Sequence, residues 1–161
     1  EFFRGEINKY GWVDTGSSFL PSEIISAYLW AQIENIEEIQ TRRIEIWNKY
    51  YLGLKEWAHK NEINLPMIPE YATNNGHMFY LICKDEQQRS NIIKRLKEKN
   101  IHAVFHYQSL HKSDYYNNIT QDNDSLPLAD MYTSNLLRLP MFYELSSQSI
   151  DYIISTLKSI I

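Results

Sequence analysis

One stripe of large side chains at helical spacing constrains the first third of this chain. Its members recur every three or four positions between residues 37 and 61: Arg43, Trp47, Tyr50, Leu54 and Trp57. Charged residues fill much of the remaining surface of this segment, so only one face is suited to a core. We therefore predict one long amphipathic helix over 37–61. A shorter helix is predicted before it, starting near Pro21 or Ser22, with apolar residues at the same spacing.

A cluster of turn-forming residues at 62–76 separates this helical arm from a segment of different character. The cluster contains Pro66, Pro69 and the sequence Asn74-Asn75-Gly76. Proline and glycine interrupt both helices and strands, and Asn-Gly favours a turn. We therefore expect a linker here, with the helical arm at residues 1–61 on one side and a small domain at 62–161 on the other.

The small domain alternates short apolar runs with helical patterns. The apolar runs have the length of strands and are expected at residues 77–83, 101–107 and 135–139. Helices are expected from Asp85 to about Asn100, directly before the third strand, and after Ser146. The polar segment 114–125 is expected to be a loop. The predicted fold class is therefore α+β, a helical arm followed by a sheet of about three strands covered by helices.

Composition and charge exclude several classes of function. The formal net charge is −4 and the sequence pI is about 5.7, so no broad cationic field is available for nucleic acid. No apolar run approaches the ~20 residues of a membrane span. The single cysteine, Cys83, excludes an internal disulfide and is compatible with a reducing compartment. We expect a cytoplasmic protein with no nucleic-acid partner and no membrane span.

Two common catalytic arrangements are missing from the sequence. His102 and His106 are four positions apart, but in a predicted strand this offset spans ~13 Å, too far to share one metal ion. Cys83 lies in an apolar run, where thiols are usually inert core residues. Phosphate-binding glycine loops and the G-x-S-x-G nucleophile elbow are also absent. The residues alone therefore predict neither a metal centre nor a nucleophilic site.

Two segments carry polar side chains where ligands often bind. His106, Tyr107 and His111 follow the end of a predicted strand. They can donate to sugar hydroxyls or phosphate oxygens, or be satisfied polar tips of a half-buried strand end. Ser17 and Ser18 precede a predicted helix, where their hydroxyls suit either a phosphate or a helix cap. On the residues alone, both interpretations stay open for each segment.

Taken together, several stretches of the chain resemble one family of enzymes. The stretches are Tyr10 to Leu20, Ala27 to Gln32, Gly76 to Tyr80, Ala103 to Tyr107 with Leu110-His111, and Leu136 to Pro140. They resemble the sugar-nucleotide aminotransferases of the DegT type, which use pyridoxal 5'-phosphate (PLP) on the type I aminotransferase fold. The resemblance extends over almost the whole chain. It implies that the chain corresponds to the C-terminal part of such an enzyme.

The resemblance implies a cofactor contact in the N-terminal loop. Many family members carry G-x-N-x-R-M before the first helix, and the Asn reaches the cofactor phosphate of the partner subunit in a homodimer. Ser18 occupies the Asn position, with Ser17 beside it. Leu20 and Pro21 replace the Arg and the Met of that motif. We therefore expect Ser17 and Ser18 to bind the cofactor phosphate.

The resemblance also implies a substrate pocket. His106, Tyr107 and His111 match the family's H-Y-x-P-L-H stretch near the sugar nucleotide, with Ser in place of Pro. Tyr10 and Trp12, in the first shared stretch, are expected to bind substrate as well. Arg138 lies in a further shared stretch, where it can hold an anion or form a structural ion pair.

The reaction that the resemblance implies is the transfer of an amino group from glutamate to a dTDP-linked 4-keto-6-deoxyhexose, for polysaccharide biosynthesis. In the family, the lysine that binds the cofactor covalently belongs to a large domain. None of the ten lysines here lies in a matching motif, so that domain is expected upstream of Glu1. The chain alone is therefore expected to be inactive.

Two alternatives to this function remain. A PLP-dependent sugar dehydratase of the same family would carry another residue in place of the upstream lysine. A stand-alone helical interaction domain would use its aromatic helical arm as a binding face.

Overall fold

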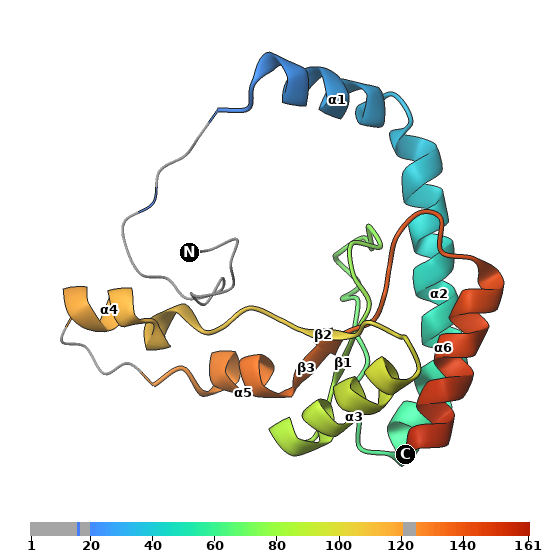
Figure 1. Cartoon of the computed structure of the whole chain (residues 1–161), viewed down its shortest axis with the longest axis vertical. Coiled ribbons are helices and arrows are strands. Elements are labelled where there is room, and N and C mark those ends of the chain that lie inside the picture. Colours follow the sequence, from blue (N-terminus) through green and yellow to red (C-terminus); the bar gives the residue numbers. More distant parts are fainter. Residues whose placement is uncertain (1–15, 17–19, 121–124) are drawn as a thin grey trace.

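The computed structural model describes residues 16, 20–120 and 125–161 (Figure 1). Two helices come first in the chain, and a small sheet with further helices follows. In chain order the elements are α1 (Glu23–Ile33), α2 (Ile36–Lys60), β1 (Tyr80–Ile82), α3 (Glu86–Glu98), β2 (Val104–Phe105), the 3-10 helix η2 (Leu110–Lys112), α4 (Asp114–Ile119), α5 (Pro127–Asn135), β3 (Leu136–Arg138) and α6 (Ser147–Ile160). The expected α+β class is confirmed.

The core lies between α2, α6 and one face of the sheet. Figure 1 shows α2 and α6 side by side, and the apolar stripe of α2 belongs to the buried core. Tyr50 and Leu54 are completely buried there, and Trp47 and Trp57 are nearly so. Phe79 packs its ring against Trp47 and Tyr50, with centroid distances of 5.5 and 5.2 Å. Each such side chain contributes roughly 1.5–3 kcal/mol to folding through burial, so the predicted stripe is the main anchor of α2.

Arg43 belongs to the same stripe but has a different role. Its Nε donates to the carbonyl oxygen of Gly76 at 3.0 Å, and its Nη2 donates to that of His77. The guanidinium of α2 therefore holds the turn that leads into β1. Gly76 has φ +59° in this turn, a conformation that favours glycine.

The sheet is antiparallel, with the strand order β1-β3-β2. Leu81 of β1 pairs with Leu137 of β3, and both side chains are completely buried in the core. Because side chains alternate along a strand, Tyr80 and Arg138 lie on the opposite face. Val104 of β2, which is 44% exposed, pairs with Arg138 on that same face. We call this second face the open face of the sheet.

The helix boundaries agree closely with the predicted ones because their caps were readable. Ser22, Asp85 and Ser146 each accept a hydrogen bond from a backbone N–H three residues later, as N-caps do. The Gln88 side chain also reaches back, but to the backbone N–H of Lys84 at 2.9 Å. A capping box would instead bind the N–H of Asp85.

Two groups of predicted boundaries were wrong. All three strands are shorter than expected, and the one predicted over 101–107 forms only Val104–Phe105. Backbone pairing, which an apolar run does not specify, limits their length. The segment 114–125 was predicted to be a loop, but Asp114–Ile119 is helical. The side chain of Ser113 caps this helix by accepting from the N–H of Tyr116 at 3.2 Å.

Helix α1 forms where it was predicted, but it contributes nothing to the core. None of its residues is buried, and Figure 1 shows it at the end of α2, away from the sheet. Its large apolar side chains are exposed: Ile24, Ile25, Tyr28, Leu29, Trp30 and Ile33. Among the described residues, no helix is long and apolar enough to cross a membrane. The expected division of the chain near residue 61 stays a prediction.

Candidate functional site

The end of β2 brings two of the predicted site residues together. The strand ends at Phe105, so His106 and Tyr107 follow it and are not part of the pleat. Strand alternation would send these two side chains to opposite faces unless the strand ended before them. It does end there, and the two rings meet edge to face at 5.0 Å, with 63° between their planes.

Arg138 completes this cluster from the central strand. Its Cζ lies 5.8 Å from the centroid of the Tyr107 ring, within the range of a cation–π contact. Its Nη2 makes a long hydrogen bond of 3.4 Å to the carbonyl oxygen of Phe105. We call His106, Tyr107 and Arg138 the strand-end cluster. It combines an imidazole, a phenol and a guanidinium, all of which can donate hydrogen bonds to a ligand.

The surroundings of His106 favour the neutral form of its imidazole. Partial burial lowers the pKa of His106 below its ordinary value, and the nearby charges of Arg138 and His77 lower it further. A neutral imidazole is therefore favoured near pH 7. In that state one ring nitrogen donates and the other accepts, which suits a hydroxyl or a carbonyl oxygen.

The third predicted residue, His111, belongs to a separate group of charges. It lies in η2 with a nearly buried side chain, and its Nε2 is 3.1 Å from Oδ1 of Asp130, within ion-pair distance but without hydrogen-bond alignment. Lys112 binds the other carboxylate oxygen of Asp130 at 2.8 Å. The hydrogen bond from Lys112 lowers the pKa of Asp130, burial opposes this, and the charges of Lys112 and His111 add to the lowering. The carboxylate thus holds both basic residues of η2.

A polar cleft of about 460 Å³ lies beside this charge group. Its lining includes the end of β2 and the segment that follows it, with Phe105, Gln108, Ser109 and Lys112. The rest of the lining comes from α3 and α5 and includes Arg89, Asp130 and Thr133. Ser109 and Thr133 share a hydrogen bond of 2.7 Å that ties η2 to α5. This cleft therefore lies directly behind the segment predicted to bind the sugar nucleotide.

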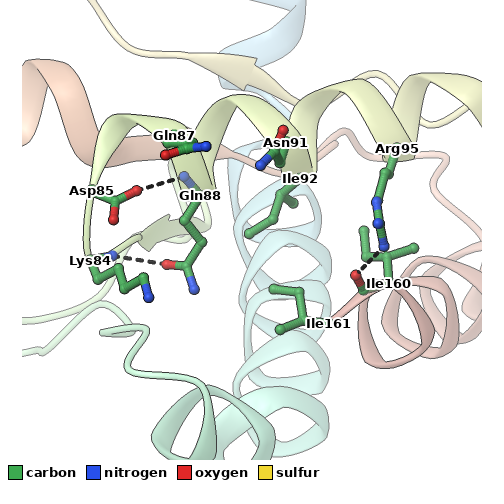
Figure 2. Close-up of a pocket in the computed structure, with 9 residues that line it drawn as sticks. All are labelled: Lys84, Asp85, Gln87, Gln88, Asn91, Ile92, Arg95, Ile160 and Ile161. Carbon is green, nitrogen blue, oxygen red and sulfur yellow. Dashed lines mark hydrogen bonds between the residues drawn. The ribbon is translucent and has the colours of Figure 1, made fainter.

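A second cleft, of about 350 Å³, lies between the start of α3 and the C-terminus (Figure 2). Three of its polar side chains, those of Asp85, Gln88 and Arg95, bind other groups of the chain. Asp85 accepts from the N–H of Gln88 at 2.7 Å, and Arg95 donates to the carbonyl oxygen of Ile160 at 2.6 Å. These contacts cap α3 and fix the end of α6, so the cleft is explained by helix capping and packing.

Four further residues predicted to belong to the site lie outside the described residues: Tyr10, Trp12, Ser17 and Ser18.

Cys83, which was predicted to be inert, lies in the core. Burial raises the pKa of its thiol to about 12, which makes the reactive thiolate rare at neutral pH. In the described part of the chain, no group of three histidine, cysteine or acidic side chains is placed to hold a metal ion.

Sequence reasoning missed Asp130 and Lys112. Lys112 adjoins a predicted residue, but nothing in its local sequence marks it as a partner. Asp130 is nearly 20 residues from His111 and comes from a helix that packs back onto η2. Only the tertiary arrangement brings the two together.

Solved aminotransferases share this fold. DesV of S. venezuelae is 22% identical, with a TM-score of 0.77 over 96% of this chain and 40% of that chain. Spr1654 of Streptococcus pneumoniae in its PLP form is 24% identical, with a TM-score of 0.75 over 86% of this chain and 35% of that chain. At these identities the likeness establishes the fold alone, which is that of PLP-dependent aminotransferases.

The sequence comparisons establish the family. The model of the DegT/DnrJ/EryC1/StrS aminotransferase family matches residues 3–158. The erythromycin biosynthesis sensory transduction protein EryC1 of Saccharopolyspora erythraea is 26% identical over 156 residues, which is 96% of this chain and 41% of EryC1. The chain belongs to the DegT/DnrJ/EryC1/StrS aminotransferase family. It spans about two fifths of the length of this curated relative.

Proposed function

We propose that this chain is the C-terminal part of a PLP-dependent sugar-nucleotide transaminase. The reaction is the transfer of an amino group from glutamate to a dTDP-linked 4-keto-6-deoxyhexose. Family membership supports the reaction class. The stretches Tyr10 to Leu20 and Ala27 to Gln32 favour an enzyme like dTDP-4-amino-4,6-dideoxygalactose transaminase.

The strand-end cluster is the observation that carries this proposal. Two of its side chains, His106 and Tyr107, follow the end of β2, and Arg138 joins them from β3 on the open face of the sheet. In this proposal the neutral imidazole of His106 and the phenol of Tyr107 bind the sugar of the substrate through hydrogen bonds. His111, held by Asp130, supports the same segment from the other side. These residues bind and orient the sugar; they do not perform the covalent step.

The cofactor contact is proposed for the loop before α1. Bound PLP supplies the electron sink for amino transfer. Ser18 and Ser17 contribute hydroxyl donors for its phosphate in the partner subunit of a homodimer. Among the described residues, Arg138 is the arginine we propose for a phosphate-bearing ligand: its Nε, like that of Arg89, is buried without a hydrogen-bond partner, but Arg89 is already paired with Glu86.

The exposure of α1 supports an assembly. A helix with apolar side chains all round its surface is usually buried against another element, yet Ile24 of α1 is 83% exposed and Tyr28 is 71% exposed. In the transaminase proposal, α1 is covered by further protein, from the rest of the enzyme or from the second subunit. The same exposure is the one observation in favour of the alternative, a helical interaction domain.

Half-reactions test the proposal. We would express the whole protein that the gene encodes and follow cofactor absorbance separately with glutamate and with the ketosugar nucleotide. His106→Ala and Tyr107→Phe should each slow the ketosugar half-reaction about 2- to 13-fold, as the loss of a hydrogen bond of roughly 0.5–1.5 kcal/mol implies. The glutamate half-reaction should change less. His102→Ala is the matched control, because this exposed histidine precedes β2.

The outcomes separate the candidates. If His106→Ala slows both half-reactions equally or neither, His106 is a packing residue and the proposed pocket is wrong. A product that has lost an oxygen and gained no nitrogen would favour the dehydratase of the same family. A gene product that binds no PLP would favour the interaction domain.

A further inference from the structure

The Asn-Gly pair in the turn before β1 is chemically reactive as well as turn-forming. The sequence contains this pair once, at Asn75-Gly76. The backbone nitrogen of a residue can attack the side-chain amide of a preceding asparagine, and glycine favours this attack because it has no Cβ to shield its nitrogen. Asparagine is for such reasons a thermolabile residue. The side chain of Asn75 is exposed to water, so this pair is a candidate for covalent modification.

Two hydrogen bonds restrain the reacting groups of this pair. The N–H of Gly76, whose nitrogen is the nucleophile, donates to Oδ1 of Asn74 at 2.9 Å. The side-chain oxygen of Asn75, whose Cγ is the atom attacked, accepts from the N–H of His77 at 3.0 Å. Contacts of this kind fix an asparagine side chain against the backbone. Gly76 has no N–H in the cyclic product, so the first of these hydrogen bonds must break for the reaction to proceed.

Arg43 of α2 keeps the turn closed from the other side. Its guanidinium binds the carbonyl oxygens of Gly76 and His77. Gly76 also packs closely on α2, since an added Cβ would lie 2.9 Å from the carbonyl carbon of Arg43. Gly76 is therefore fixed through its N–H, through its carbonyl oxygen and through packing. An intramolecular attack requires the reacting atoms to approach one another, so the turn must open locally before Gly76 can reach Asn75.

We propose that Asn75 is a site of spontaneous deamidation whose rate Arg43 limits by keeping the turn closed. In the open turn, the nitrogen of Gly76 forms a bond to Cγ of Asn75, and the bond from Cγ to Nδ2 breaks. The amide proton of Gly76 leaves with the Nδ2 group as ammonia. Water then opens the cyclic imide at either carbonyl carbon, which gives aspartate or isoaspartate at position 75. The reaction needs no cofactor and no substrate, so it is independent of the proposed function.

The two products should differ in their effect on the turn. Aspartate leaves the backbone unchanged, and its carboxylate can accept from the N–H of His77 as the amide does. Isoaspartate leads the main chain through the former side chain and lengthens it by one methylene next to Gly76. Because Gly76 has no free space against α2, the lengthened chain should not close on Arg43 again. The isoaspartate product should therefore keep the turn open.

Peptide mapping by mass spectrometry tests the site. The whole protein that the gene encodes is incubated at mildly alkaline pH, either native or unfolded in guanidinium chloride, and the conversion of each asparagine is followed with time. In the unfolded protein Asn75 should convert faster than Asn74, its neighbour in the same turn, which precedes no glycine. In the native protein the conversion of Asn75 should be slower than in the unfolded protein.

Arg43→Met is the decisive variant. It should accelerate the native conversion of Asn75 by about 5- to 150-fold, as the loss of two hydrogen bonds implies, with the rate in the unfolded protein as the upper limit. Arg42→Met is the matched control, because Arg42 binds carbonyl oxygens of the segment between β3 and α6 and not of the turn. It should leave the rate unchanged. If Arg43→Met loses the circular dichroism of the native protein, Arg43→Lys takes its place and should give a smaller acceleration.

Three results would overturn the proposal. One is conversion of Asn75 in the unfolded protein no faster than that of Asn74, and another is equal conversion of Asn75 in the native and unfolded proteins. The third is a native rate that Arg43→Met does not change, or that Arg42→Met raises by the same factor. None of these measurements depends on transaminase activity, so the proposed function can fail in the half-reaction assay while this proposal stands, and the reverse.

Discussion

The turn before β1 offers a sharp test of how the sheet is held onto α2. Gly76 has φ +59° and lies directly against the backbone of α2. A Cβ at this position would lie 2.9 Å from the carbonyl carbon of Arg43 and 3.0 Å from its oxygen. We therefore expect Gly76→Ala to destabilise the chain, through the strained conformation and through the close contact together.

The expected magnitude follows from those two effects. A non-glycine residue in the left-handed region costs about 1–2 kcal/mol. Overpacking against atoms that cannot move away costs about 1–3 kcal/mol, and the backbone of a long packed helix is such a group. The lower entropy of the unfolded alanine chain returns about 0.4–1 kcal/mol. The free energy of unfolding should fall by about 1–5 kcal/mol.

Urea unfolding followed by circular dichroism measures this change. Gly16→Ala is the matched control, because among the described residues outside its chain neighbours no atom lies within 4 Å of its added Cβ, and it should be neutral or slightly stabilising. Arg43→Met removes the two side-chain hydrogen bonds to the turn but leaves the backbone of α2 in place. The cost of Gly76→Ala should therefore persist in the Arg43→Met background. A cost below about 1 kcal/mol, or one that vanishes with Arg43→Met, would refute the reasoning.

Three further perturbations follow from particular contacts. Gly53→Ala should not yield the usual gain of about 1 kcal/mol in a helix, because its Cβ would lie 2.6 Å from Cδ1 of Ile154; adding Ile154→Val, which removes that atom, should recover the gain in urea unfolding. Cys83 should react with a thiol reagent near neutral pH no faster than the chain opens, since burial raises its pKa to about 12; rapid labelling of the native chain would contradict this. The pKa of Asp130 is lowered in the folded chain, so its stabilisation is present above its unfolded pKa of about 3.9 and is lost as the pH falls through the lower folded pKa. Asp130→Asn and Lys112→Met should therefore each destabilise the chain near neutral pH and lose that effect in acid, measured as unfolding free energy against pH.

The helices of this chain were largely predictable from local signals. In α2 and α6 a stripe of apolar residues recurs at helical spacing, and in α3 a cap and an apolar stripe coincide. Helix α4 was missed because its six residues contain no apolar stripe, and a serine cap alone does not separate a short helix from a turn.

The strands were found in place but not in length. An apolar run of seven residues indicates burial, whereas a strand exists only where a second strand supplies hydrogen bonds. Among the described residues, strand pairing in the predicted 101–107 strand involves Val104 and Phe105, and both pair with β3. The adjacent Ala103 is buried without pairing, so its apolar character reflects the core and not the sheet.

The candidate site depends on strand order, which no local pattern encodes. His106 and Tyr107 were predictable as residues at a strand end, since their position in the chain is enough to place them there. Arg138 joins them only because β3 is the central strand, paired with β1 on one side and β2 on the other. If the strand order were β3-β1-β2, the residue paired with Val104 would belong to β1. The guanidinium of Arg138 would then be one strand further away from His106. The chemistry of this site is therefore set by a pairing between residues more than thirty positions apart.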